Sequence, residues 1–148
     1  MRQFQPSDPD FAARVHESFS EQEFMQTLDA ELSVCLPGEV AIHMRYSPML
    51  TQQDGFLHAG VVTALADTAC GYAAMTLMPE GAEVLSVEFK VNLLSPAVGE
   101  GFIAHGEVIK PGRTLTVCRG DVCAVKDGEE KLVATMQATM ITRLPRFD

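Results

Sequence analysis

The sequence predicts an α+β domain in which a five- to six-stranded antiparallel sheet wraps around one long central helix. The helix is indicated by residues 58–78, where apolar character is almost continuous until Pro79 and Gly81 stop it. The sheet is indicated by the segments after residue 83, which alternate apolar and polar residues and are separated by short turn signals. Strands joined by short turns pair antiparallel. A helix that is apolar on nearly all sides must be buried against another element, and here the sheet can bury it.

The chain of 148 residues fits a single domain, 1–148, with an N-terminal helical segment over residues 1–35 and a core over residues 36–148. Ser7 and Asp8 are candidate caps for the first helix. Apolar residues at helical spacing follow these caps: Phe11, Val15, Phe19, Phe24 and Leu28. The helix can be interrupted between Phe19 and Phe24. Residues 39–46 alternate as expected for a first strand.

A long strand is expected at residues 84–94, because its side chains alternate with a period of two. One face should be apolar and buried while the other is polar: Leu85, Val87, Phe89, Val91 and Leu93 against Ser86, Glu88, Lys90 and Asn92. Further strands are expected at residues 101–110, 113–126 and 132–141, with turns at 111–112 and 127–128.

Charge and composition exclude several classes of function. The formal net charge of -9 and the isoelectric point near 4.8 disfavour nucleic acid and anionic membrane surfaces as partners. Residues 1–15 lack the apolar run of a secretory signal, and segment 59–78 carries Asp67 at its centre without basic flanks, which argues against a membrane span. The cysteines lack metal-type spacing, so we expect reduced thiols, no metal site and a cytoplasmic location.

Asp67 is the most informative residue, because it places a carboxylate inside the apolar helix expected at residues 58–78. Burial of an unpaired carboxylate costs free energy, and such groups are concentrated at functional sites. Its neighbours at helical spacing are small, which would let a ligand or a main chain lie close to the helix: Gly60, Thr63, Ala64, Cys70, Gly71 and Ala74. Cys70 itself is expected to be a small buried hydrophobe rather than a nucleophile.

Four motifs then carry a resemblance to a known family. They are Gly55-x-x-His58-Ala59-Gly60, Leu65-Ala66-Asp67, Leu85-Ser86-Val87-Glu88-Phe89 and Leu94-Ser95-Pro96-Ala97. In this order and spacing they resemble the hotdog-fold acyl-CoA thioesterases of the phenylacetic acid degradation (PaaI-like) group, within the 4-hydroxybenzoyl-CoA thioesterase superfamily. The resemblance covers about residues 52–143 and implies a hotdog fold, a homodimer or a dimer of dimers, and active sites at the dimer interface.

The resemblance also implies roles for individual residues. Asp67 falls on the catalytic carboxylate of the family, and His58-Ala59-Gly60 falls on an HGG turn whose middle amide points at the thioester carbonyl. Gln52 replaces an asparagine, and Ser86 falls on a Ser or Thr that reaches a site shared with the neighbouring subunit. This chain departs from the family pattern at Gln52 and at Ala59, which stands where the family has a glycine.

Hydrolysis of a thioester needs few catalytic groups, so one carboxylate and one backbone amide can suffice. Its thiol leaving group has a pKa of about 8.5, so a dedicated general acid is not essential. Asp67 can act as a general base or as a nucleophile, and backbone amides near Ala59 and Gly60 would stabilise the oxyanion. For His58, capping or orienting the loop is the expected role, and the alternatives are a general base or a metal ligand.

Coenzyme A is a polyanion, so an acidic chain needs local positive charge to bind it. Lys110, Arg113 and Arg119 lie where the family places residues at the mouth of the nucleotide site, and the alternative for them is surface ion pairing. CoA is part of the expected substrate, a medium-chain or aryl acyl-CoA, and no separate cofactor is expected. Two other functions stay open from the sequence: a hotdog-fold enoyl-CoA hydratase or dehydratase, and a non-catalytic acyl-CoA binding protein.

Overall fold

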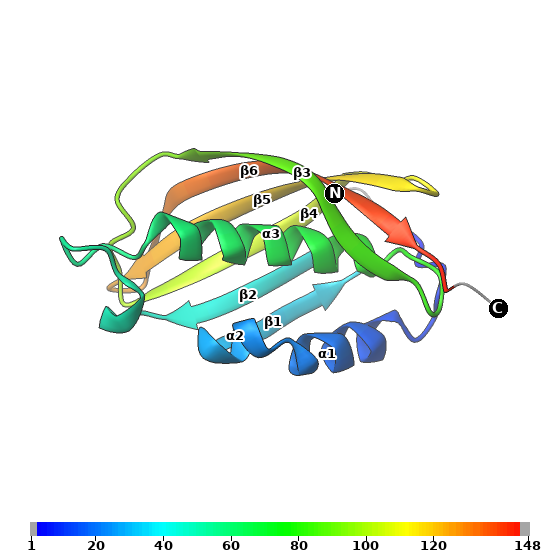
Figure 1. Cartoon of the computed structure of the whole chain (residues 1–148), viewed down its shortest axis with the longest axis horizontal. Helices are drawn as coiled ribbons and strands as arrows, with labels where there is room; N and C mark the ends of the chain where they lie inside the picture. The colour runs from blue at the N-terminus through cyan, green and yellow to red at the C-terminus, as the bar shows by residue number, and fades with distance from the viewer. Residues whose placement is uncertain (1–2, 146–148) are drawn as a thin grey trace.

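One six-stranded antiparallel sheet curls around helix α3, and two shorter helices lie beside one of its edges (Figure 1). The computed structural model describes residues 3–145. The strands follow the order β1-β2-β4-β5-β6-β3, so β1 and β3 form the two edges, and this arrangement confirms the predicted α+β hotdog fold. The elements are α1 (Phe11–Glu21), α2 (Glu23–Thr27), β1 (Ala30–Leu36), β2 (Glu39–Arg45), the 3-10 turn η1 (Pro48–Leu50), α3 (Ala59–Met75), β3 (Glu83–Leu93), β4 (Gly101–Lys110), β5 (Leu115–Lys126) and β6 (Glu129–Arg143).

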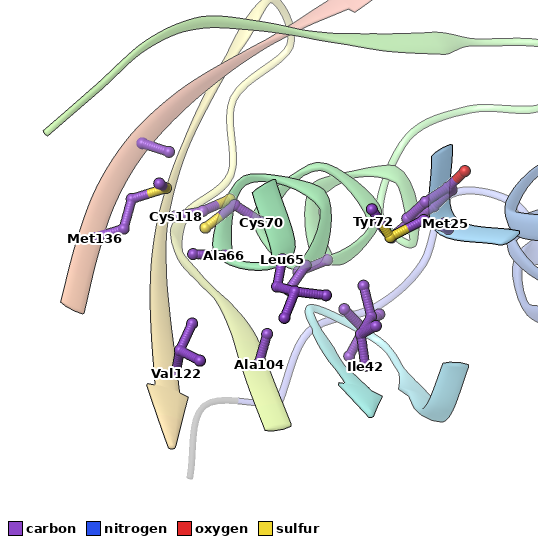
Figure 2. Close-up of a cluster of buried hydrophobic side chains, with 14 of the residues drawn as sticks. Met25, Ile42, Leu65, Ala66, Cys70, Tyr72, Ala104, Cys118, Val122 and Met136 are labelled. Atoms are coloured by element: carbon purple, nitrogen blue, oxygen red, sulfur yellow. The ribbon is translucent and has the colours of Figure 1, made fainter. Parts of the chain in front are cut away.

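Helix α3 lies very close to the middle of the sheet, because glycines on β4 and β5 leave room for it. A Cβ atom on Gly106 would collide with the carbonyl oxygen of Ala69, and one on Gly120 would lie 2.8 Å from Cys70 Sγ. Figure 2 shows Leu65 pointing from the helix into the apolar side chains of the sheet. The backbone of α3 is therefore fixed against the sheet, which fixes the residues on its other side as well.

The C-terminal end of α3 is held by Arg14 from α1. Its guanidinium donates hydrogen bonds to the carbonyl oxygens of Met75 (3.1 Å), Met78 (2.8 Å) and Pro79 (3.0 Å), and its Nε lies 3.0 Å from a carboxylate oxygen of Asp8. Carbonyls at the end of a helix have no partner within the helix, so a cation there satisfies them and complements the helix dipole. The contact ties the N-terminal helices to α3.

The expected extent of the N-terminal helical segment, residues 1–35, is wrong. Its helices end at Thr27, and β1 begins at Ala30 after Asp29 adopts a positive φ of 52°. Residues 30–36 pair with β2, and their period-two alternation was visible in the sequence. The helical spacing of the apolar residues before them masked that alternation.

A β-bulge at Val87 changes which residues of β3 share a face. Ser86 pairs with Met140 and Glu88 pairs with Thr139, so Val87 is an extra residue without a partner on β6. Residues that are opposite each other in an antiparallel pair point to the same side of the sheet. Because Met140 is buried against the core, Ser86 also points inward rather than to the polar outer face.

The single buried apolar face predicted for residues 84–94 is therefore wrong. After the bulge, Phe89 and Leu93 are on the inner side, whereas Leu85 pairs with Ile141 on the other side. In the single chain Leu85, Phe89 and Leu93 keep 49%, 42% and 53% of their surface exposed. Strand β3 thus presents an apolar, uncovered sheet edge.

Candidate active site

The first turn of α3 leaves one backbone amide free. His58 is the N-cap residue, and its Nδ1 accepts a hydrogen bond from the Gly60 N–H at 2.8 Å, which agrees with the expected capping role. The Ala59 N–H has no hydrogen-bond partner within residues 3–145. Because the amides of a first helical turn carry the positive end of the helix dipole, Ala59 presents a donor suited to an anionic oxygen.

The side chain of Gln52 shapes the loop that precedes α3. Its Oε1 accepts hydrogen bonds from the backbone N–H groups of Asp54 (2.5 Å) and Phe56 (3.3 Å). Gln52 and Ala59 line a pocket of about 360 Å³, whose further walls are mostly apolar: Phe56, Leu57, Val62, Leu94, Pro96 and Val133. The amide oxygen of Gln52 is thus occupied by its own turn, and the residue lies beside the approach to Ala59.

Asp67 and Ser86 form the second part of the site. The Ser86 hydroxyl donates a hydrogen bond to Asp67 Oδ1 at 2.6 Å, which joins α3 to β3 within one chain. Such a donor fixes the orientation of the carboxylate. Asp67 is only partly buried, so the burial expected from the sequence is wrong for the single chain. Ser86, expected to reach a neighbouring subunit, here contacts the Asp67 of its own chain.

A pocket of about 450 Å³ opens beside Asp67 and Ser86. Its far wall was not anticipated from the sequence: the Tyr72 hydroxyl lies 3.2 Å from Ser18 Oγ and 3.3 Å from Gln22 Nε2. The only signal in the sequence was a tyrosine in a mostly apolar helix, and no motif marked the N-terminal segment that bonds to it. The pocket is lined between these ends by residues of α2, α3 and β3: Phe24, Gly71, Met75, Val84 and Leu85.

The two parts of the site are separated within one chain. Asp67 and Ala59 are eight residues apart on α3, and a rise of 1.5 Å per residue places them about 12 Å apart along the helix. They also line different pockets. One thioester carbonyl cannot contact both groups of the same chain, so the structure brings Asp67 to Ser86 and Gln52 to Ala59 without joining the two pairs.

The basic residues expected to bind CoA do not form one cluster. Lys110 and Arg113 are exposed near the turn after β4, and Arg113 lines a pocket near the end of α3. Arg119 points to the outer face of the sheet, where a hydrogen-bonded ion pair with Asp121 at 2.7 Å raises the pKa of its guanidinium. Lys90, which the sequence did not single out, lines the same outer hollow as Arg119.

The buried cysteines take no part in such chemistry. Cys70 and Cys118 lie next to each other in the core (Figure 2), and burial raises the pKa of both thiols, that of Cys118 to about 12. A thiol that stays protonated at neutral pH is a poor nucleophile, so Cys70 acts as the small buried residue that was expected. Within residues 3–145 no cluster of three His, Cys, Asp or Glu side chains is placed to hold a metal ion.

Comparison with known proteins gives this geometry a chemical context. Residues 54–131 match the family model of the thioesterase superfamily, which is more than half of the chain. The chain belongs to the thioesterase superfamily. A thioesterase family protein from Silicibacter pomeroyi, known from its crystal structure, shares 52% identity with this thioesterase at a TM-score of 0.90, over 91% of this chain and 99% of that one.

Two more distant relatives extend the comparison. The PaaI protein from the phenylacetic acid degradation operon of E. coli has a TM-score of 0.80 at 18% identity, over 90% of this chain and 94% of that one, which shows a shared fold. A Halobacterium salinarum protein that carries the name of an esterase is 29% identical over 126 residues, or 81% of this chain and 83% of the relative.

Membership of the thioesterase superfamily confirms the family resemblance seen in the sequence. It supports thioester hydrolysis as the general activity of the chain. Within residues 3–145, this thioesterase has no helix that is both long enough and apolar enough to cross a membrane.

Proposed function

We propose that the chain hydrolyses acyl-CoA thioesters with medium-chain or aryl acyl groups, releasing a free acid and CoA. The observation that carries the proposal is the Asp67 carboxylate, which the Ser86 hydroxyl holds at 2.6 Å beside a pocket of about 450 Å³. A pocket of this size, lined by both apolar and polar side chains, has room for an acyl group next to its reacting carbonyl.

Asp67 supplies either a base or a nucleophile. As a base, it takes a proton from water while the water oxygen attacks the thioester carbonyl; the C–S bond then breaks with its electron pair on sulfur, and the thiolate takes up the proton. As a nucleophile, Asp67 forms an anhydride and expels the thiolate, and water then cleaves the anhydride. Ser86 occupies Oδ1, and Oδ2 has no hydrogen-bond partner within residues 3–145, which leaves it available for either role.

A complete site, in this proposal, needs two copies of the chain. One copy supplies Asp67 and Ser86, and the other supplies the Ala59 amide and the Gln52 loop. The separation of about 12 Å along α3 supports this arrangement, because antiparallel α3 helices related by a twofold axis would place Asp67 beside Ala59 of the partner subunit. The edge strand β3 and the residue after it offer an apolar surface for such pairing: Leu85, Val87, Phe89, Leu93 and Leu94.

Binding of the CoA moiety is assigned to exposed basic residues, with Arg113 and Lys110 as the first candidates. Both are exposed near the turn after β4, whereas Arg119 is already paired with Asp121. If Arg113 contacts a phosphate, Arg113→Glu should raise KM for an acyl-CoA and leave KM for the matching acyl-pantetheine, which lacks the nucleotide, unchanged. An equal KM change for both substrates would contradict the assignment.

Release of free thiol from a panel of acyl-CoAs tests the function itself. We expect turnover by the wild type and a loss of about 100-fold or more in Asp67→Asn. Glu88→Gln is the matched control, because Glu88 is another carboxylate that accepts a hydroxyl hydrogen bond, from Thr139 at 2.5 Å, but it lies on the outer face of β3. Equal activity of the wild type and Asp67→Asn would overturn the assignment of Asp67.

Two other outcomes would replace the proposal. Hydration of an enoyl-CoA without release of thiol would indicate a hotdog-fold hydratase. Tight binding of acyl-CoA without turnover over hours would indicate an acyl-CoA binding protein.

A further inference from the structure

The pocket beside Asp67 extends furthest toward the C-terminal end of α3. Its lining residues on α3 run from Ala64, one turn N-terminal to Asp67, to Met75, which is eight residues C-terminal to Asp67, or about 12 Å along the axis. The start of β3 and the N-terminal helices close the other sides. A group that extends from a carbonyl near Asp67 toward Met75 must therefore pass Gly71, which lies one turn along the helix.

Gly71 differs from the glycines that let α3 approach the sheet. A Cβ atom on Gly120 would lie 2.8 Å from Cys70 Sγ, whereas a Cβ on Gly71 would meet only Val84 Cγ1, at 4.0 Å. That distance is an ordinary van der Waals contact, so the packing of the helix leaves room for a side chain at position 71. A glycine within a helix is also less stable than an alanine. Neither packing within the single chain nor helix stability accounts for a glycine here.

The open volume at Gly71 does account for it. We propose that Gly71 sets the depth of the acyl pocket and thereby admits acyl groups of medium length or with an aryl ring. This inference rests on the proposed thioester hydrolysis. A side chain at position 71 would project between α3 and Val84, across the path from Asp67 to the far wall at Tyr72. Acyl groups short enough to end before Gly71 would still fit, and longer ones would not.

The far wall limits the pocket beyond Gly71. Tyr72 is almost fully buried, and its hydroxyl is hydrogen-bonded to Ser18 and Gln22, so this wall is held in place by the N-terminal helix α1. Its ring also packs edge-on against Phe19 at a centroid distance of 5.6 Å. Because the far wall is fixed and the near end is Asp67, position 71 is the place where a single side chain can shorten the pocket.

The test is a comparison of Gly71→Ala, Gly71→Leu and the wild type on acyl-CoAs from acetyl to decanoyl and on phenylacetyl-CoA. For Gly71→Leu we expect kcat/KM to fall about tenfold or more for octanoyl- and phenylacetyl-CoA, and less than about threefold for the shortest substrate that the wild type hydrolyses. Gly71→Ala should raise the melting temperature by about 2 to 4 °C, which shows that the helix tolerates a side chain there. The double variant Gly71→Leu/Val84→Ala should recover part of the octanoyl activity, because it reopens the volume opposite position 71.

Three results of this comparison would contradict the role of Gly71 or the proposed function. An active wild type whose chain-length profile is unchanged in Gly71→Leu would overturn the role of Gly71 and leave the proposed function standing. An equal loss for short and long substrates in Gly71→Leu, without rescue by Val84→Ala, would also overturn it. A wild type that hydrolyses no thioester of the panel would overturn the proposed function, and this inference with it.

Discussion

A proline at position 59 would remove one hydrogen-bond donor and leave helix α3 in place. Ala59 is the first residue of the helix, where proline is well tolerated, and the preceding His58 already has φ -60° and ψ 136°, the extended conformation that a following proline requires. The Ala59 N–H has no partner within residues 3–145, so its loss breaks no bond of the described fold. If this amide stabilises the oxyanion, Ala59→Pro should lower kcat by about 100- to 1000-fold.

The proposed two-copy site makes a further numerical prediction for mixtures of inactive variants. When Ala59→Pro and Asp67→Asn chains are unfolded together in equal amounts and refolded, half of the dimers should contain one chain of each kind. Every mixed dimer then has one site with both changes and one site with neither. The mixture should therefore recover about 25% of the wild-type specific activity, measured as thiol release, although each variant alone is nearly inactive.

A matched mixture provides the control. Ser86 and Asp67 are bonded within one chain, so Ser86→Ala mixed with Asp67→Asn leaves every site with one defect and should recover no activity beyond the two parents. Recovery in both mixtures, or in neither while Ala59→Pro alone is inactive and folded, would refute the division of the site between two chains. An unchanged kcat in Ala59→Pro would refute the role of its amide.

Three further predictions concern stability. Arg14→Met should cost about 3 kcal/mol in urea unfolding, because it strips the end of α3 of its cation and leaves a buried carboxylate unpaired. Gly106→Ala should destabilise the fold by about 3 kcal/mol or prevent folding, because its Cβ would collide with Ala69. Burial raises the pKa of Cys70 and Cys118, so above about pH 8.5 the unfolded state loses protons that the folded state keeps, and stability should fall by up to about 1.4 kcal/mol per pH unit per thiol.

Controls separate these causes. Asp8→Asn added to Arg14→Met should restore part of the lost stability, and a further loss would contradict the unpaired-carboxylate explanation. The alkaline loss should become smaller in a variant with alanine at both Cys70 and Cys118, and an identical slope in that variant would refute the linkage. Gly106→Ala is compared with Gly71→Ala, since only the first has a backbone atom in the way.

The sequence predicted elements well wherever one pattern dominated locally. The strand at residues 101–110 was predicted with its exact bounds, and the central helix was predicted with an end three residues too late. β1 was missed because Phe24 and Leu28 continue a helical spacing up to the residue where the chain turns into the strand. The local sequence cannot show whether the helical spacing or the period-two alternation determines the structure there, because pairing with β2 determines it.

The sequence predicted which residues belong to the candidate site better than it predicted how they are arranged. Asp67 was placed on the helix by its apolar surroundings and by the family motif, but its bond to Ser86 depends on the bulge at Val87. That bulge has no glycine or proline to mark it in the sequence, so strict alternation assigned Ser86 to the wrong face. The separation of Asp67 from Ala59 follows from helix geometry, whereas the scatter of the basic residues follows from strand positions that spacing alone does not fix.

The bulge at Val87 also divides β3 into two segments that can change independently. The first segment carries Ser86 to the carboxylate, and the second presents Phe89 and Leu93 along the open edge. In a strand without a bulge, a one-residue insertion or deletion in the segment of Phe89 and Leu93 would shift the register of the whole strand and turn Ser86 away from Asp67. Here a spare residue stands between them, so a shift on the edge side can be absorbed at the bulge. If two copies pair along this edge as proposed, their contact can change in sequence without a loss of the Ser86 hydroxyl that holds Asp67.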